Sequence, residues 1–206
     1  GKTGNTERFG TGGKFQAKLQ GPEDKLLLYM RYAYTRDEGI ESDNLVVGGI
    51  DFESYFRKIH SWYARLELEH DRIKSIELRT TAAVGYGYFL LKKPRHSLRV
   101  RIGMMYRHND YRDQSSDSTP GLDIGLLHLY RFDNSWKVQN DITYTPSLEN
   151  YHDYSVHHES YFEIPVAASE IWKLQLGMTN DYTGRPADDK QYLDTTYFGR
   201  LVLSWP

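Results

Sequence analysis

The chain has 206 residues, with 26 Lys and Arg against 28 Asp and Glu and a formal net charge of −2 at pH 7. This balance excludes a basic field spread over the whole chain, of the kind that binds nucleic acid, and a long acidic disordered block. The absence of cysteine excludes disulfides, thiolate nucleophiles and cysteine-ligated metals. The length suits one domain, so we treat residues 1–206 as a single unit.

Segments in which apolar and polar residues alternate follow one another along the whole chain, and helical periodicity is nearly absent. Eleven such segments lie at residues 6–20, 25–36, 44–57, 61–71, 75–91, 96–111, 120–132, 135–147, 153–166, 170–183 and 193–205. Many are longer than ten residues, which is the length that a tilted strand needs to cross a bilayer. The pattern predicts an all-β protein of eleven long strands.

One segment shows the two faces of such a strand most clearly. Its apolar residues are Trp62, Ala64, Leu66 and Leu68, and its alternate residues are Tyr63, Arg65, Glu67 and Glu69. In a soluble barrel the apolar face turns inward, whereas in a membrane barrel it faces lipid and the charges line the lumen. The orientation of this strand therefore decides the class of the protein.

The connections between the predicted strands alternate in length. Tight connections lie at 21–24, 58–60, 92–95, 133–134 and 167–169, and longer polar ones at 37–43, 112–119, 147–152 and 184–192. Only the short connection at 72–74 departs from the alternation. Short turns at one end and long loops at the other are typical of bacterial outer-membrane barrels. We therefore predict a transmembrane, antiparallel, up-and-down β-barrel located in the bacterial outer membrane.

The positions of the tryptophans predict one membrane interface of this barrel. Trp62, Trp136 and Trp172 each follow a tight connection, and Trp205 closes the last segment. Amphipathic aromatic rings gather where hydrocarbon meets headgroups, so these four residues predict a girdle at the periplasmic interface. Four tyrosines near the long loops are expected at the opposite interface, namely Tyr34, Tyr106, Tyr144 and Tyr182.

The charged side of the strands predicts a lumen lined by residues of both signs, which we call the charged ladder. It comprises Arg31, Asp51, Glu53, Arg65, Glu67, Glu69, Glu77, Arg79, Arg99, Arg101, Arg107, Lys137, Asp141, Glu159, Glu163, Lys173 and Arg200. Opposite charges are expected on neighbouring strands, with Arg31 beside Asp51 and Glu53. Likewise, Lys137 and Lys173 are expected to flank Glu159 and Glu163. The alternative is a soluble barrel whose charges face water.

A twelfth strand is expected upstream of Gly1. Bacterial single-chain barrels have even strand numbers, and direct closure would place Arg200 opposite Lys14 and Lys18 with no acid between them. The Gly4-Asn5 pair is a turn signal that would join such a strand to the first segment. We therefore expect twelve strands, eleven of them in this chain.

The sequence gives less support to a lipid hydrolase, a metal site or a calcium-binding loop. His158 and Ser160 share a face of one strand, which suggests a lipid hydrolase, but neither an acid nor an oxyanion device is recognisable beside them. His108 with Asp110, and His152 with Asp153, are solvated loop residues rather than metal ligands. The acidic stretch 37–43 lacks the positions of a calcium-binding loop. We expect no enzyme activity, no cofactor and no metal site.

Four stretches resemble a known family. They are T-G-N-T-E at Thr3 to Glu7, A-A-V-G-Y-G-Y at Ala82 to Tyr88, Y-R-H-N-D-Y at Tyr106 to Tyr111, and R-L-V-L-S-W at Arg200 to Trp205. In order and spacing the chain is similar to the YdiY-like family of putative salt-induced outer-membrane proteins. The resemblance implies an outer-membrane barrel of poorly defined function, in some bacteria preceded by a soluble periplasmic segment, and it implies no catalytic residues.

The expected function is that of a narrow channel, or of a structural or partner-binding membrane module, with a charged and salt-bridged lumen. Expected partners are outer-membrane lipid, including lipopolysaccharide, and other envelope proteins, but not nucleic acid. An outer-membrane lipid hydrolase and a soluble ligand-binding β-barrel are the alternatives.

Overall fold

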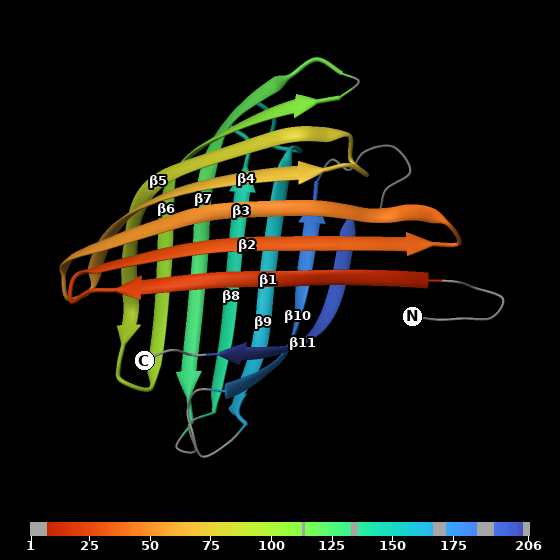
Figure 1. The fold of residues 1–206 in the computed structure, drawn as a ribbon. Coiled ribbons are helices and arrows are strands. Elements are labelled where there is room, and N and C mark those ends of the chain that lie inside the picture. Colours follow the sequence, from red (N-terminus) through yellow and green to blue (C-terminus); the bar gives the residue numbers. More distant parts are fainter. Residues whose placement is uncertain (1–7, 113, 133–135, 167–171, 185–191, 204–206) are drawn as a thin grey trace. The chain divides into compact units, whose positions relative to one another are not determined.

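The computed structural model describes residues 8–112, 114–132, 136–166, 172–184 and 192–203. All regular elements in these ranges are β-strands (Figure 1). They are β1 (Arg8–Gln20), β2 (Asp24–Asp37), β3 (Ile40–Arg57), β4 (His60–Asp71), β5 (Ile76–Lys92), β6 (His96–Tyr111), β7 (Asp117–Arg131), β8 (Lys137–Pro146), β9 (Tyr154–Pro165), β10 (Trp172–Thr183) and β11 (Leu193–Leu203). The predicted all-β class and the eleven predicted strands are confirmed.

The strands form one sheet in chain order, from β1 to β11. Sequential strands pair antiparallel, as in β1 with β2, β8 with β9, and β10 with β11. Each strand therefore pairs with the strand that precedes it along the chain, which is the up-and-down arrangement that the alternating segments predict.

One connection differs from its prediction. The polar stretch 37–43 was expected to be a long loop, but β2 and β3 extend into it and leave only a tight turn at Glu38 and Gly39. Both turn residues have positive φ, at 49° and 84°, and Arg36 Nε donates to Gly39 O over 2.7 Å. The register also shifts between Thr35 and Arg36, which is the irregularity that a β-bulge introduces. Of the acidic residues here, Asp37, Glu41 and Asp43 are therefore strand residues, and Glu38 lies in the turn.

The chain divides into two compact units. Unit 1 contains residues 1–56, 61–85 and 104–121, and unit 2 contains residues 57–60, 86–103 and 122–206. Strands β5, β6 and β7 contribute residues to both units. The clusters described below each lie within one of the two.

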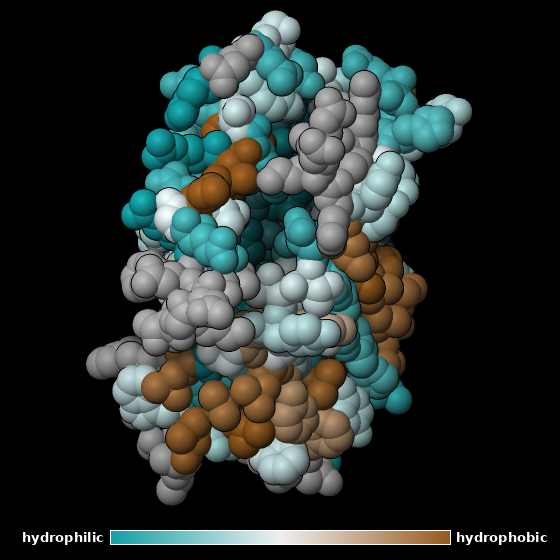
Figure 2. Space-filling model, turned by 90° about the vertical axis from the view of Figure 1, so that its right-hand side faces the viewer, coloured by the Kyte–Doolittle hydropathy of each residue, from teal (hydrophilic) through white to brown (hydrophobic). Residues whose placement is uncertain are grey.

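The apolar core is very small. In unit 1, Tyr63, Ala83 and Met105 form a buried cluster on β4, β5 and β6. Most of the fully buried side chains among the described residues are instead polar or charged, and large hydrophobic side chains lie openly on the surface (Figure 2). This is the reverse of the distribution in a water-soluble domain, in which charged side chains are almost never fully buried.

Candidate functional site: a buried polar face

The strand β4 has one polar face and one apolar face, and the polar one is covered. Ser61 and Tyr63 are fully buried, and Arg65 is half-buried, whereas Leu66 and Leu68 on the alternate face are 42% and 45% exposed. We call the side of the sheet that carries Ser61 and Arg65 the polar face, and the side that carries Leu66 the apolar face. Successive side chains of a strand point to opposite sides, so this division continues along each strand.

In unit 1 a hydrogen-bonded chain of side chains crosses four strands of the polar face. Arg79 on β5 contacts both carboxylate oxygens of Glu69 on β4, at 3.1 and 3.2 Å. Its Nε donates to Asn109 Oδ1 on β6 over 2.7 Å, and Asn109 Nδ2 donates to Asp117 Oδ1 on β7 over 2.7 Å. One guanidinium therefore joins an acid and an amide that stand on either side of it.

Two further carboxylates of unit 1 accept hydrogen bonds from neutral hydroxyls. Glu53, which is 1% exposed, accepts from Ser61 Oγ over 2.7 Å, and Glu67 Oε2 accepts from the Tyr29 hydroxyl over 2.5 Å. Hydrogen bonding to the charged form offsets part of the cost of removing a carboxylate from water.

In unit 2 the first polar cluster surrounds Arg101. Its Nε lies 3.2 Å from Asp123 Oδ2, and its Nη2 donates to Thr143 Oγ1 over 3.1 Å. Asp123 is fully buried. Gly125, two residues beyond Asp123 on β7, makes room for the arginine, because a Cβ atom at this position would lie 2.5 Å from Arg101 Nε and 2.7 Å from its Cγ.

The second cluster of unit 2 surrounds Glu163, which is buried on β9. Lys137 Nζ on β8 lies 3.0 Å from one of its oxygens, and Lys173 Nζ on β10 lies 3.7 Å from the other. Gln175 Nε2 also donates to Glu163 over 2.6 Å. The expectation that Lys137 and Lys173 flank this acid is confirmed, and two cations share one carboxylate.

The members of the charged ladder differ in how far they are covered. Glu53, Arg99 and Glu163 are buried and Glu77 is exposed. The remaining thirteen are partly covered: Arg31, Asp51, Arg65, Glu67, Glu69, Arg79, Arg101, Arg107, Lys137, Asp141, Glu159, Lys173 and Arg200. At least partial cover is therefore the rule on this face, and Glu77, near the start of β5, is the exception.

The register corrects two details of the expected pairing. Arg31 lies opposite Val47 rather than beside Asp51 or Glu53, because the β2–β3 turn is shorter than the predicted loop. Arg200 is not without an acid on its own side, since its Nη2 lies 3.0 Å from Glu159 Oε2. The charge of Arg200 therefore has a partner within this chain and does not by itself require a twelfth strand.

On the apolar face, aromatic rings lie towards both ends of the strands. Trp62, Trp136 and Trp172 are 46%, 39% and 43% exposed, while Trp205 lies outside the described residues. Phe52 packs edge-on against Trp62, and Phe162 packs edge-on against Trp136, each with ring centroids 5.3 Å apart. These contacts place Trp62 and Trp136 within aromatic clusters.

At the opposite ends of the same strands, tyrosines form a row in unit 2. Tyr154 lies between Tyr144 and Tyr182, with ring centroids 5.7 Å from each, and Tyr182 also stacks on Tyr192 at 6.2 Å. Two of the four tyrosines expected at this level, Tyr144 and Tyr182, are therefore in one aromatic row. Of the others, Tyr106 is 53% exposed and Tyr34 is half-buried.

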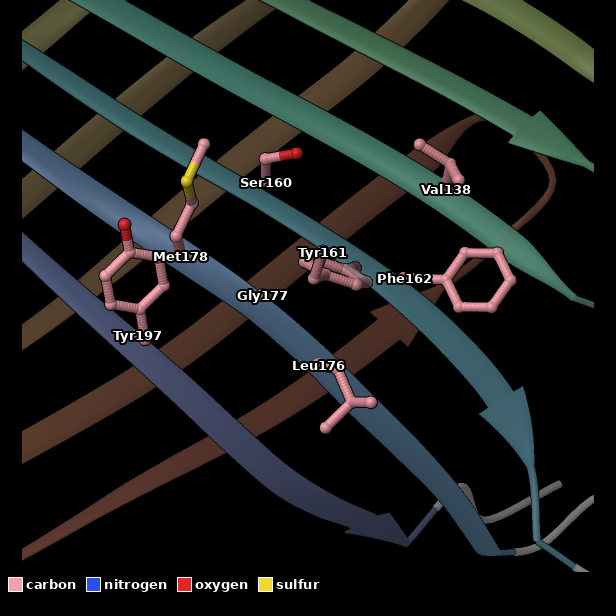
Figure 3. Close-up of a pocket in the computed structure, with 8 residues that line it drawn as sticks. All are labelled: Val138, Ser160, Tyr161, Phe162, Leu176, Gly177, Met178 and Tyr197. Carbon is pink, nitrogen blue, oxygen red and sulfur yellow. The ribbon is translucent and has the colours of Figure 1, made fainter.

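His158 and Ser160 lie on β9 but form separate hydrogen bonds. Ser160 Oγ donates to Asn140 Oδ1 over 2.7 Å, and His158 Nδ1 contacts Asn180 Nδ2 at 3.1 Å. Among the described residues, no hydrogen bond joins the histidine to the serine. A hollow of about 460 Å³ lies beside Ser160 (Figure 3). Gly177 lies in the middle of its lining, which also includes Val138, Tyr161, Phe162, Leu176, Met178 and Tyr197.

Sequence reasoning missed the neutral partners of the charged ladder. Tyr29, Asn109, Thr143 and Gln175 each hydrogen-bond to a ladder residue. Tyr29, Thr143 and Gln175 alternate with apolar neighbours in their own strands, which was a local signal that they belong to the polar face. Asn109 stands between His108 and Asp110 and gave no such signal. Which charge each one meets depends on inter-strand register, which has no comparable local signal.

The described residues contain no helix that is both long and apolar enough to cross a membrane. Within the same part of the chain, no three or more His, Cys, Asp or Glu side chains are grouped so that they could hold a metal ion.

Comparison with known proteins identifies the family. No curated protein sequence matches the chain. A family described as "Protein of unknown function, DUF481" matches residues 1–205. Because this match covers nearly the whole chain, the protein belongs to that family of unknown function.

Proposed function

We propose that the protein is a transmembrane β-barrel of the bacterial outer membrane, with its apolar face in lipid and its polar face around a narrow interior. One observation carries the proposal, namely the inverted burial of the two faces. Glu53 and Asp123 are 1% and 0% exposed, whereas Phe15 and Val84 are 66% and 60% exposed. Lipid is the solvent in which that distribution is favourable, because it covers the apolar face.

Water is a poor solvent for this surface. Each exposed side chain of the size of Leu or Phe forgoes roughly 1.5–3 kcal/mol relative to burial. Soluble monomers rarely expose a contiguous apolar patch of more than a few hundred Å². The exposed set among the described residues extends along the chain from Phe15 on β1 to Leu201 on β11. This argues against the soluble ligand-binding barrel.

The two aromatic levels are separated by a distance that suits a bilayer. On β10, Trp172 and Tyr182 stand ten residues apart. At about 3.3 Å per residue this is roughly 33 Å along the strand, and a tilt of about 40° reduces it to a height of roughly 25 Å. An apolar band of about 25 Å flanked by aromatic girdles is the pattern of outer-membrane barrels. Trp62, Trp136 and Trp172 are accordingly assigned to one interface.

The interior that we propose is lined by paired charges. Because Arg79, Arg101 and Glu163 each contact an oppositely charged residue, the walls carry little net charge. The protein then acts as a narrow, weakly conducting passage for small ions, or as a structural module that other envelope proteins contact. Closure by a twelfth strand, membership of the YdiY-like group and contact with lipopolysaccharide belong to this same proposal.

Membrane insertion is tested first. The refolded chain is reconstituted into vesicles with lipids brominated at defined depths, and tryptophan fluorescence is recorded. We expect quenching to be strongest for bromines near the headgroups, because the girdle lies at the interface. A chain that stays monomeric in buffer without detergent and is not quenched by brominated lipid would refute membrane insertion.

Conduction is tested second, by single-channel recording in planar bilayers. We expect small conductance steps and weak ion selectivity in the wild-type protein. Glu163→Gln removes the carboxylate that Lys137 and Lys173 share, so the measured reversal potential should shift towards anion selectivity. Glu77→Gln, at an exposed position of the charged ladder, is the matched control and should change the reversal potential less. If the inserted protein does not conduct, the passage for ions is refuted and the structural module remains as the proposed function.

The lipid-hydrolase alternative receives less support from the geometry. The Ser160 hydroxyl donates to Asn140 rather than to His158, and an activated serine needs a base within hydrogen-bonding reach. Release of fatty acid from phospholipid vesicles that disappears in Ser160→Ala would reverse this preference.

A further inference from the structure

Two histidines on neighbouring strands of unit 2 face each other through the same ring atom. His96 on β6 and His128 on β7 have their Nε2 atoms 3.1 Å apart. Their ring centroids are 5.2 Å apart and the ring planes meet at 74°. By strand alternation both lie on the apolar face, opposite to Arg99 and Asp123, and both are half-buried.

The separation of the two nitrogens matches that of two ligands on one metal ion. With metal–nitrogen bonds of about 2.0–2.1 Å, ligand nitrogens stand roughly 2.9 Å apart at a bond angle of 90° and roughly 3.4 Å apart at the tetrahedral angle. The observed 3.1 Å lies between these values. A small pivot of each ring would direct both lone pairs at one ion, without movement of the strands.

A second set of contacts involves the other ring nitrogen of His128, Nδ1. Asn140 on β8 lies directly opposite His128 in the register, and its Nδ2 is 3.1 Å from His128 Nδ1. Asn140 in turn accepts a hydrogen bond from Ser160 Oγ over 2.7 Å. An amide can present either its oxygen or its nitrogen by turning over, so Asn140 can accept the Nδ1 proton of a His128 whose Nε2 is a ligand. Metal-binding histidines usually have such a partner on the other ring nitrogen.

We propose that His96 and His128 bind a divalent first-row transition-metal ion, of the Zn²⁺ and Cu²⁺ class, through their Nε2 atoms. Imidazole suits these ions well, whereas Mg²⁺ and Ca²⁺ prefer oxygen ligands. His96 is the first residue of β6, immediately after the connection at 93–95, and its ring lies 5.5 Å from that of Tyr130. The site therefore stands at the end of a strand, where water completes the coordination sphere.

The proposal is independent of what the barrel interior does. No third histidine or acid joins the two ligands among the described residues, so the ion is held by two protein ligands and exchanges with solvent. Asn140 positions His128 and does not itself bind the metal. The site adds reversible metal binding to the apolar face.

The experiment titrates folded, tag-free protein in detergent with Cu²⁺ and with Zn²⁺, using isothermal calorimetry and, for Cu²⁺, nitrogen hyperfine splitting in electron paramagnetic resonance. We expect one ion per chain and a spectrum with two equatorial nitrogens. His96→Gln and His128→Gln should each abolish this binding, and Asn140→Ala should weaken it by about 10- to 100-fold. His70→Gln is the control, because His70 lies on β4, where its Nδ1 contacts the backbone carbonyl of Glu77 on β5, and it contacts neither His96 nor His128 through this nitrogen.

Folding of each variant is checked by far-UV circular dichroism and by the heat dependence of its electrophoretic mobility. Glutamine retains a hydrogen-bonding group, so the variants keep a donor and an acceptor at each position. The proposal fails if folded wild-type protein binds neither ion at 1:1 stoichiometry, or if either His→Gln variant binds as tightly as wild type. Equal losses in His70→Gln would also overturn it.

Discussion

Gly125 offers the sharpest mutational test of the polar face. In Gly125→Ala the added Cβ would lie 2.5 Å from Nε, 2.7 Å from Cγ and 3.0 Å from Cδ of Arg101. These atoms form the stem of the side chain and not its far end, so the whole arginine must move. Its ion pair with the fully buried Asp123 and its hydrogen bond to Thr143 would then be lost.

The size of the effect follows from these contacts. Breaking a buried ion pair costs about 3–5 kcal/mol when the remaining charge stays buried. Arg101 retains 13% exposure of its side chain, which favours the lower end of that range. Replacing glycine by alanine returns about 0.4–1 kcal/mol by restricting the unfolded chain. We therefore expect the free energy of unfolding to fall by roughly 2–3 kcal/mol.

The assay is urea unfolding of the protein in lipid vesicles, followed by tryptophan fluorescence. Gly13→Ala is the matched control, because a Cβ atom at Gly13 meets nothing within 4 Å, so only the gain of about 0.4–1 kcal/mol from the restricted unfolded chain should be measured. In an Arg101→Ala background the atoms that clash are absent, so Gly125→Ala should cause no loss of stability and should show the same small gain as Gly13→Ala. An equal loss of stability in that background would show that the arginine is not the cause.

Two further predictions concern single positions on the two faces. Ser61→Ala removes the hydroxyl that donates to the buried Glu53, so the free energy of unfolding in the same urea assay should fall by about 1–3 kcal/mol, and no loss would mean that Glu53 does not depend on this bond. Leu66→Lys places a charge on the apolar face, which should cost about 2–4 kcal/mol in vesicles if the position lies near the bilayer midplane. The matched change at Ile40, which is 74% exposed next to the β2–β3 turn, should cost much less, and equal costs at both positions would argue against lipid contact at Leu66.

The metal-site and polar-face proposals concern different chemistry in one sheet. The charged ladder occupies the covered face, where every charge needs a partner. The His96 and His128 pair lies on the exposed face, where an isolated polar group is costly in lipid unless it has a partner. In both cases the side chains that matter stand on neighbouring strands, so their contacts depend on the register between those strands.

Most of the fold follows from short-range pattern. A strand has a period of two residues, so each of the eleven segments reveals its own two faces, and most of the predicted boundaries lie within a few residues of the observed strands. The largest difference is at β3, where the polar character of residues 40–43 suggested a loop. Polar residues are equally compatible with the exposed end of a long hairpin, and the backbone of Glu38 and Gly39 closes that hairpin tightly.

Pairing across strands was predicted less well. Lys137 and Glu163 met as expected because the two residues stand directly opposite each other where β9 pairs with β8. Arg31 did not meet Asp51, because the turn and the register shift at Thr35 displaced β3 relative to β2. A shift in register changes every cross-strand neighbour while leaving the alternation within each strand intact.

The sequence by itself therefore determined the β class, the number of strands in this chain and the two-faced character of each one, because these depend on residues that are close along the chain. Only the tertiary structure decided that Arg31 lies opposite Val47, that Arg101 packs against Gly125, and that His96 meets His128. Those outcomes depend on turn geometry, register and the space that residues such as Gly125 leave for a neighbouring side chain, and these are properties of paired strands.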